Sequence, residues 1–470
     1  MDQPLCPGCR LRDERIAVLE QRVCELEGVV QNLSQRLNTN STNSSLPPSA
    51  NPLGAAHPAT KKKKAKRKAG GQPGHPPHLK QLVPIERVDK VIPLVPTICE
   101  HCDAKLPAEA GPDDPDPTRH QHFEMPPKVI ETTEWQGHAR TCKCCGHVNR
   151  AVIPADIRAH SVGPRLAGTL SYLAGELGVS KRGVAGFADE ICGAPLCVGT
   201  ICALEQEMSA ALAPAHQEAI EAVRNADVKN VDETSWKLKG VTHWLWAAAT
   251  ATVAAFVIHA RRSALGLAAL LGEALHGIHC SDRWGVYGLL PVGQRQLCWA
   301  HLKRDFQKVV DRGGATAELG RRALRVVRDT FKLWHQFRGG GLTRAELQRR
   351  LESVQNRMNL ILIEGLCGVA GPVATFCENV HALEDALWTF ARVEGVEPTN
   401  NHIERLLRKG VLWRKRSFGC SSVAGCRFVE RILTVVQTLR LQKRRVLDFL
   451  HASLQAHRAG EKGTKLLVGG

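Results

Sequence analysis

The stretch after Asn225 constrains the fold most, because the pattern of the chain changes there from helices to strands. Three runs rich in β-branched and aromatic residues follow one another with short breaks, which predicts an antiparallel meander. These runs are VKNVDETSWKL, THWLWAAAT and TVAAFVIHA. A helical pattern, RSALGLAALLGEAL, comes next, followed by a strand, GIHCSD, and a fifth apolar run, RQLCWAHL. We therefore expect an α/β domain.

The positions of three acids fit this domain. Three antiparallel strands, a helix and a further strand is the element order of the RNase H-like α/β fold. That fold places one acid on its first strand and another at the end of its fourth, and the two strands are neighbours. Asp232 and Asp282 occupy these positions. Much later, EPTNNHIERLLRKG opens with a proline and an asparagine pair that suit a helix start, so Glu404 falls in the first turns of a helix.

Asp232, Asp282 and Glu404 would repel one another at a single point unless cations lay between them. Oxygen ligands suit Mg²⁺ or Mn²⁺, which leave positions for water and phosphate. Two such ions about 3.5–4 Å apart stabilise the attacking and leaving oxygens of an in-line phosphoryl transfer. Each acid taken singly is equally well an ordinary surface residue. Their placement in these three elements favours a site for two metal ions.

Three segments resemble the catalytic blocks of the bacterial insertion-sequence-66 family of DDE transposases. They are VDETSWKL, SDRWGVYGLLPVGQRQLCWAHLKRDF and EPTNNHIERLLRKGVLWRKRSFGC. The order of the earlier parts is also similar: a leucine-zipper-like start, a basic GGQPGHP linker and a ribbon with cysteine pairs. The resemblance implies an enzyme that cleaves the ends of its insertion element and joins the 3′-OH to target DNA. It implies a metal-binding triad of Asp232, Asp282 and Glu404, and the supporting residues His301, Asn400, Asn401 and Arg405.

The N-terminus repeats apolar residues with the 3.5-residue period of a coiled coil. One set is Ile16, Val23, Val30 and Leu37, and the other is Leu19, Leu26 and Leu33. This period favours a parallel coiled-coil dimer over residues 1–45 above a single amphipathic helix that packs on its own chain. We therefore expect a homodimer.

Residues 46–82 are rich in Asn, Ser, Pro and Gly and read as a linker. Seven of its eight residues from 61 to 68 are basic, and they are Lys61, Lys62, Lys63, Lys64, Lys66, Arg67 and Lys68. Two interpretations stay open for this run, a solvated tail and an arm that binds the DNA backbone.

Residues 83–155 turn strand-like and hold two CxxC pairs, which predicts a zinc ribbon. Because a CxxC turn presents two thiolates to one ion, two such turns complete a tetrahedral structural site. The ligands are then Cys99, Cys102, Cys142 and Cys145, with Cys144 and His147 as nearby substitutes. The isolated pair Cys6 and Cys9 is either inert or meets its copy across the dimer.

Residues 156–225 read as helices with a glycine-containing break, GVSKRG. A DNA-binding helix-turn-helix unit and an ordinary helical bundle both fit this pattern. In the first interpretation Lys181 and Arg182 contact phosphates. The catalytic domain then spans 226–450, with a helical insertion at about 311–394 among the 121 residues between Asp282 and Glu404. Such an insert suits a DNA hairpin, a flanking strand or a dimer partner.

The segment from Glu404 to Arg445 holds twelve basic residues and two acids, so it should carry DNA backbone beside the triad. Arg414, Lys415 and Arg416 are its densest basic group. Trp413 and Phe418 are candidates to stack on an unpaired base. A place in the core is the better interpretation for Phe418. We expect a flexible tail over residues 451–470.

The formal charge of +17 and a pI near 9.3 point to a polyanionic partner, nucleic acid first. No apolar run reaches the ~18–20 residues that span a bilayer, and the start lacks the apolar core of a secretion signal. We therefore expect a cytoplasmic protein with reduced cysteines and no membrane partner. DNA and companion proteins of the same element are the expected partners. The alternatives are a DNA-binding regulator without catalysis and another RNase H-like nuclease.

Overall fold

A computed structural model of the chain describes residues 15–30 except 17, 24, 28 and 29, and residues 82–467 except 110, 113, 127, 128 and 315. The chain divides into two units, one of residues 56–133 and one of residues 1–55 with 134–470. Each unit is described by itself. The basic run 61–68, the cysteines at 6 and 9, and the last two predicted heptad leucines lie outside the described residues.

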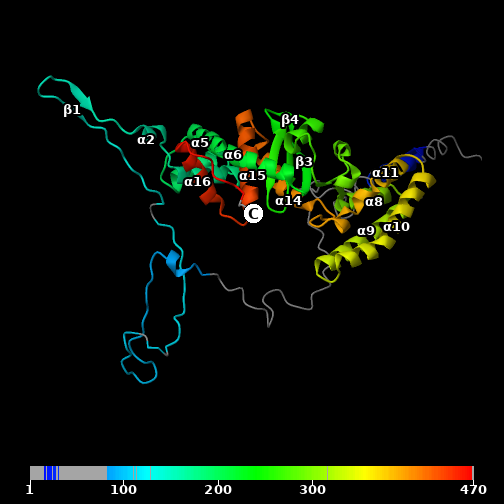
Figure 1. Cartoon of the computed structure of the whole chain (residues 1–470), viewed down its shortest axis with the longest axis horizontal. Coiled ribbons are helices and arrows are strands. Elements are labelled where there is room, and N and C mark those ends of the chain that lie inside the picture. Colours follow the sequence, from blue (N-terminus) through cyan, green and yellow to red (C-terminus); the bar gives the residue numbers. More distant parts are fainter. Residues whose placement is uncertain are drawn as a thin grey trace, which may run out of the picture. The chain divides into compact units, whose positions relative to one another are not determined.

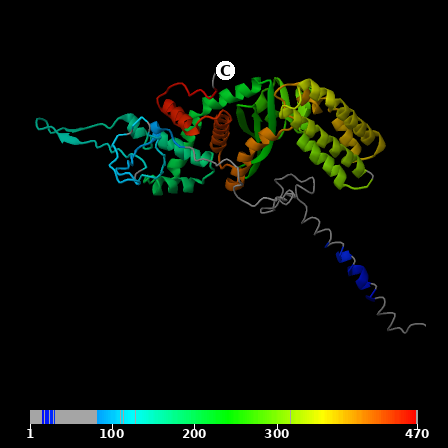
Figure 2. The same cartoon turned by 90° about the horizontal axis from the view of Figure 1, so that it is seen from below.

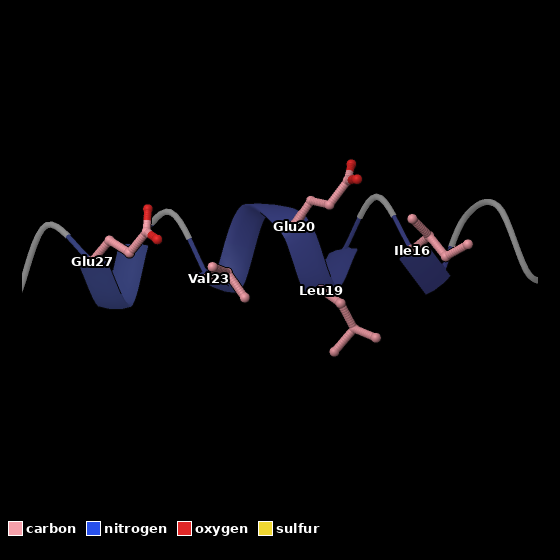
Figure 3. Close-up of a pocket in the computed structure, with 5 residues that line it drawn as sticks. All are labelled: Ile16, Leu19, Glu20, Val23 and Glu27. Carbon is pink, nitrogen blue, oxygen red and sulfur yellow. The ribbon is translucent and has the colours of Figure 1, made fainter.

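The described residues between Arg15 and Val30 are helical. Three heptad side chains of this segment, Ile16, Leu19 and Val23, are exposed by 45%, 56% and 53%. Figure 3 shows Leu19 and Glu20 on opposite sides of the helix. The segment therefore has the apolar stripe that the heptads predict, while pairing with a second copy stays a prediction.

The predicted ribbon contains little regular structure. In unit 56–133 the described residues form the 3₁₀ turn η2 (Ile85–Arg87) and an isolated bridge between Ile98 and Lys105. In the other unit, β1 (Ala139–Thr141) and β2 (Val148–Arg150) form an antiparallel hairpin. The domain limits 83–155 remain a prediction.

A five-stranded mixed sheet lies at the centre of residues 226–300, in the order β5-β4-β3-β6-β7. Its strands are β3 (Val228–Leu238), β4 (Val241–Ala249), β5 (Ala254–His259), β6 (Ile278–Ser281) and β7 (Arg295–Leu297). The first three are antiparallel, whereas β6 and β7 run parallel to β3. This topology is compatible with the RNase H-like core that the element order predicts. The fifth apolar run is a strand for three residues only, since α8 begins at Trp299.

Helices cover both faces of the sheet (Figure 1). Trp236, Leu245 and Phe256 pack against α14 (Asn401–Ser417) and α15 (Val423–Leu441). On the opposite face, Val231 and Trp246 pack in a core with α6 (Ala213–Asn225) and α7 (Ala264–Leu271). Side chains alternate along β3, so neighbouring residues serve different layers. This alternation places Asp232 on the α14 face and Glu233 on the other.

Polar side chains of α15 close the free edge of the sheet. Each accepts a hydrogen bond of 2.6–3.0 Å from a backbone N–H of β5. The bonds run from Ala254, Phe256 and Ile258 to Thr438, Thr434 and Glu430. These acceptors lie one helical turn apart, and they satisfy donors that an uncovered edge would offer to another chain.

The helices before the sheet are α2 (Ala155–Ala159), α3 (Pro164–Gly175), α4 (Lys181–Glu190), α5 (Val198–Ala211) and α6. The last four of these, α3 to α6, share one core with α15 and α16 (Val446–Arg458), whereas α2 has no buried residue. We expected a flexible tail from residue 451, but α16 continues to Arg458, because Leu454 extends the buried stripe of Leu450. Leu466 is also fully buried, and its N–H donates to Glu218 at 2.8 Å.

The residues between β7 and α14 form a helical body whose core also includes Cys280 of β6 and Leu297 of β7. It comprises α8 (Trp299–Asp311), α9 (Thr316–Arg338), α10 (Arg344–Gly368), α11 (Pro372–His381), α12 (Glu384–Leu387) and α13 (Thr389–Arg392). Figure 2 shows α9 and α10 (yellow-green to yellow) as a long hairpin beside the sheet. The predicted insertion is therefore helical, and its helices begin earlier than expected, at Trp299. No helix in the described part of the chain is long and apolar enough to cross a membrane.

Candidate active site

Asp232 lies in the middle of β3, on the face that α14 covers. Its Oδ1 accepts a hydrogen bond of 2.9 Å from the Glu233 N–H. Burial raises the pKa of the Asp232 carboxyl well above its ordinary value, and the charges of Glu233, Asp282 and Glu404 raise it further. The fold thus places the three predicted acids in one electrostatic group.

Asp282 follows the last residue of β6, the strand parallel to β3. Its Oδ1 accepts from the Trp284 N–H at 2.8 Å, a bond that folds the chain back over the strand end. Its carbonyl accepts from Arg295 of β7 at 3.3 Å. The Asp282 backbone is therefore anchored to the sheet through Arg295.

Glu404 lies in the first turn of α14, as the sequence predicts. The preceding Asn400 is the helix N-cap, yet its side chain does not cap the helix. Instead, its Nδ2 donates to the Val231 carbonyl at 2.8 Å, and its Oδ1 accepts from Asn230 at 2.8 Å. Because Asn400 is almost completely buried, these bonds attach the start of α14 to β3 beside Asp232.

His301 of α8 faces Glu404, with 3.6 Å between Nδ1 and the nearer carboxylate oxygen. Neither atom has a hydrogen-bond partner, although both are buried. Burial lowers the pKa of His301, and Arg304 lowers it further, while Glu404 and Asp282 oppose the shift. The His301 ring therefore lies beside an unsatisfied carboxylate oxygen.

Cys298, His301 and Glu404 also bring three possible ligand atoms within 4.8 Å of one another. The thiol is a poor member of that group. Burial raises the pKa of Cys298 to about 11, so it stays protonated at neutral pH. Its Sγ already accepts from the Asn400 N–H at 3.1 Å. Because metals bind the thiolate, the protonated Cys298 serves as an anchor for Asn400.

The three acids fit divalent cations with hard oxygen ligands. Asp232 sits among like charges that destabilise its ionised form. One oxygen of Glu404 is buried and unpaired. Cations would relieve both conditions, and carboxylate oxygens are the ligands that Mg²⁺ and Mn²⁺ prefer.

Sequence reasoning missed a polar group on the opposite face of β3. Glu233 accepts from the Tyr287 hydroxyl at 2.6 Å and from Arg262 at 2.6 and 2.8 Å. The Arg262 guanidinium lies over Trp284 at 4.0 Å and over Trp244 at 4.8 Å. Tyr287 belongs to η3 (Gly285–Leu289), so the group holds the loop after Asp282 against β3. Its only sequence signal was an acid placed one residue after Asp232.

The remaining predicted site residues lie in different settings. Asn401 and Arg405 are exposed on α14, and within the described residues neither side chain forms a hydrogen bond to the three acids. Arg414 points back to β3, where it bonds the Ser235 carbonyl and hydroxyl. Arg416 donates to the Leu177 carbonyl at 2.8 Å, whereas Lys415 is exposed.

Lys181 and Arg182 open α4 instead of lying in the break before it. Lys181 forms an ion pair of 2.5 Å with Glu205 of α5. This contact joins two helices of the core, as a bundle requires. A helix-turn-helix role for these two residues stays a prediction.

Phe418 contradicts the interpretation that it belongs to the core. Its side chain is 82% exposed, and its backbone is left-handed with φ 57°. Trp413 is partly buried instead and contacts Phe428, with 6.2 Å between ring centroids. The helix ends at Phe418, so its ring projects where the apolar stripe of α14 has already stopped.

Each CxxC pair forms a tight turn in its own unit. The Asp103 N–H donates to the Cys99 carbonyl, and the Gly146 N–H donates to the Cys142 carbonyl. Backbone N–H groups of His101 and Cys102 lower the pKa of Cys99. Those of Cys145 and Cys144 lower the pKa of Cys142 in the same way. Both turns therefore favour thiolates, and the shared zinc site remains a prediction.

Comparison with known families matches two parts of the chain. The model of the Transposase IS66 family matches residues 161–427, which include all three acids. A model of a family of unknown function matches residues 9–81. No curated protein matches the chain.

Proposed function

This chain belongs to the IS66 family of transposases, and on that premise we propose that it cleaves the ends of its insertion element and joins the 3′-OH to target DNA. The observation that carries the proposal is the electrostatic group of Asp232, Asp282 and Glu404 on three separate elements. Simple DNA binding does not require carboxylates beside a phosphate, since like charges repel. A phosphoryl-transfer site with cations does require them.

Asp232, Asp282 and Glu404 would hold two Mg²⁺ or Mn²⁺ ions. When bound, such ions activate water and neutralise charge on the attacking and leaving oxygens. The chain's own contribution is to fix the three carboxylates. Asn400 attaches the helix of Glu404 to β3, and the Glu233 group attaches the loop of Asp282 to the same strand. His301 borders Glu404 and restricts where its carboxylate points.

Strand cleavage on DNA that carries the element's own ends tests this proposal. The expected result is Mg²⁺- or Mn²⁺-dependent cleavage by the natural chain and none by Asp232→Ala, Asp282→Ala or Glu404→Ala. End binding should survive in all three variants. Binding without cleavage by the natural chain would favour a DNA-binding regulator. Preferred turnover of a branched junction or an RNA–DNA hybrid would favour another nuclease.

We also propose that the N-terminal helix pairs two copies of the chain. Its apolar side chains are exposed along the described segment, and Leu26 is 56% exposed. A monomer would leave this stripe in water, whereas a parallel pair would bury it. Sedimentation of the full chain should give a dimer, and Leu19→Glu with Leu26→Glu should give a monomer. An unchanged mass would exclude this helix as the interface.

A further inference from the structure

We propose that Phe418 stacks on a base of the bound DNA, at a turn whose cations hold the backbone around it. The proposal rests on the proposed function, because it takes DNA as the partner. It adds a contact outside the three acids. In residues 134–467, Phe418 has the highest exposed fraction of the large hydrophobic side chains described, at 82%. An aromatic ring costs free energy in that position unless a partner covers it.

The turn that contains Phe418 is fixed by a required glycine and by backbone hydrogen bonds. Phe418 and Gly419 have φ values of 57° and 104°. A Cβ on Gly419 would lie 2.2 Å from the Lys237 carbonyl, so this position requires glycine. The Cys420 N–H donates to that carbonyl at 2.8 Å, and the Lys239 N–H donates to the Cys420 carbonyl at 2.9 Å. The turn that contains the Phe418 ring is therefore hydrogen-bonded to the end of the β3–β4 hairpin.

The left-handed backbone of Phe418 is a second sign of a role for this side chain. Only four non-glycine residues in the described part of the chain have positive φ. Left-handed backbone costs an L-residue stability, which glycine or asparagine would avoid. The left-handed backbone does not bring this side chain into a packed position, because the ring is exposed. A partner that covers the ring offsets the cost.

Cations without a carboxylate partner lie on both segments that form this turn. Arg414, Lys415 and Arg416 precede it, and the hairpin bonded to its turn contributes Lys237 and Lys239. None of these five cations forms an ion pair with a carboxylate of the described residues. A polyanion with stackable faces satisfies both features, since phosphates meet the cations and a base meets the ring. That partner is DNA.

The fold also fixes how far this contact lies from the three acids. Phe418 lies fourteen positions after Glu404, which corresponds to ~20 Å along α14. On β3, the step from Asp232 to Lys237 covers ~17 Å. Figure 1 shows α14 beside β3, so both elements lead from the acids to the same turn. At ~3.4 Å per nucleotide of one strand, the unpaired base that stacks lies about five or six nucleotides from the scissile phosphate.

The test uses the full chain, DNA with the element's ends in which the nucleotides near the cleavage point are left unpaired, and no divalent metal, so that cleavage plays no part. 2-Aminopurine replaces one adenine at a time near the end, and its emission reports stacking. We expect a change about five or six positions from the cleavage point, and its loss in Phe418→Ala. Phe418→Ala should also weaken binding by roughly 5- to 100-fold, the range for one base–aromatic stack. Phe418→Trp should retain both.

Matched variants separate the ring from charge and from the turn. Val423→Ala removes another exposed apolar side chain, 61% exposed at the start of α15, and should change neither readout. Lys415→Ala should lower the salt dependence of log K by about 0.9, whereas Phe418→Ala should leave it unchanged. Alanine keeps the left-handed strain at position 418, so relief of strain does not explain a difference.

Equal behaviour of Phe418→Ala and Val423→Ala in emission and affinity would overturn the stacking proposal. The proposal would also be overturned if Phe418→Ala abolished binding to anionic vesicles and left DNA binding unchanged. Failure of the proposed function looks different. The natural chain would then show no metal-dependent cleavage, while the emission change and its loss in Phe418→Ala would still be observed.

Discussion

Asn400 donates a hydrogen bond of 2.8 Å to the carbonyl of Val231, the residue before Asp232. This bond connects two acids that are far apart in sequence, because Asn400 also starts the helix of Glu404. The relative position of Asp232 and Glu404 therefore depends on one buried amide.

Asn400→Ala should lower metal-dependent cleavage by about a hundredfold, since a displacement of about 1 Å has that effect on an active site. The variant leaves the Val231 carbonyl and the Asn230 amide without partners, which costs about 1–3 kcal/mol of folding stability. Cleavage and the free energy of unfolding are both measured. Asn356→Ala on the exposed face of α10 is the control. Cleavage by Asn400→Ala equal to that control would show that the amide does not position Glu404.

Asp232→Asn should stabilise the metal-free protein at neutral pH. The pKa of Asp232 is higher in the folded chain, so folding becomes less favourable as pH rises from about 3.8 through the folded pKa. Asparagine removes that charge and still accepts from the Glu233 N–H. Each kcal/mol gained raises Tm by roughly 2–4 °C in a domain of 150–250 residues. Scanning calorimetry with a chelator measures the Tm of both proteins. A lower Tm in the variant would contradict repulsion between Asp232 and the neighbouring acids.

His216 should make the fold sensitive to mild acid. Burial lowers the pKa of His216 to about 4, and its Nε2 donates to the Phe256 carbonyl at 2.9 Å. The unfolded chain therefore binds more protons between pH 6.5 and pH 4, and this ring contributes stability that is lost as pH falls through that window.

The difference in unfolding free energy between the natural chain and His216→Gln should change by up to ~1.4 kcal/mol per pH unit in this window. Denaturant titrations at several pH values measure it. His335→Gln, on the exposed face of α9, is the matched control. A constant difference across the window would mean that His216 is not held neutral.

Zinc content tests the cysteine pairs. One zinc ion per chain at Cys99, Cys102, Cys142 and Cys145 predicts that Cys142→Ser lowers the metal content by one ion. Cys144→Ser and the exposed Cys367→Ser should not change it. Elemental analysis of the purified proteins gives the count. Loss of the zinc ion in Cys144→Ser but not in Cys145→Ser would show that Cys144 is the ligand in place of Cys145.

The framework of the candidate site was largely predictable because it depends on local patterns. The run VKNVDETSWKL has the same bounds as β3, and the Pro–Asn signal located the helix of Glu404. These features follow from side-chain period and helix-start chemistry. The sequence also indicated an Asn pair at this helix start, but in the structure the side chain of Asn400 bonds to β3 and not to its own helix.

Features that depend on which elements meet were not predictable. Glu233, Arg262 and Tyr287 are separated by 54 residues at most, and nothing local brings them together. Phe418 has an apolar side chain that favours the core, yet the left-handed end of α14 turns it outward. Leu466 follows a polar stretch, and it is buried because α6 supplies Glu218 to its backbone. Each outcome depends on tertiary contacts that outweigh the local preference.

The central claim is that Asp232, Asp282 and Glu404 form one metal-dependent site for DNA cleavage. The most direct test compares strand cleavage by the natural chain and by Asp282→Ala on DNA with the element's own ends, with Mg²⁺ or Mn²⁺ and with a chelator. We predict cleavage by the natural chain only with metal, and none by the variant, although both bind the DNA. Equal cleavage by Asp282→Ala, or cleavage that persists in the chelator, would contradict the claim.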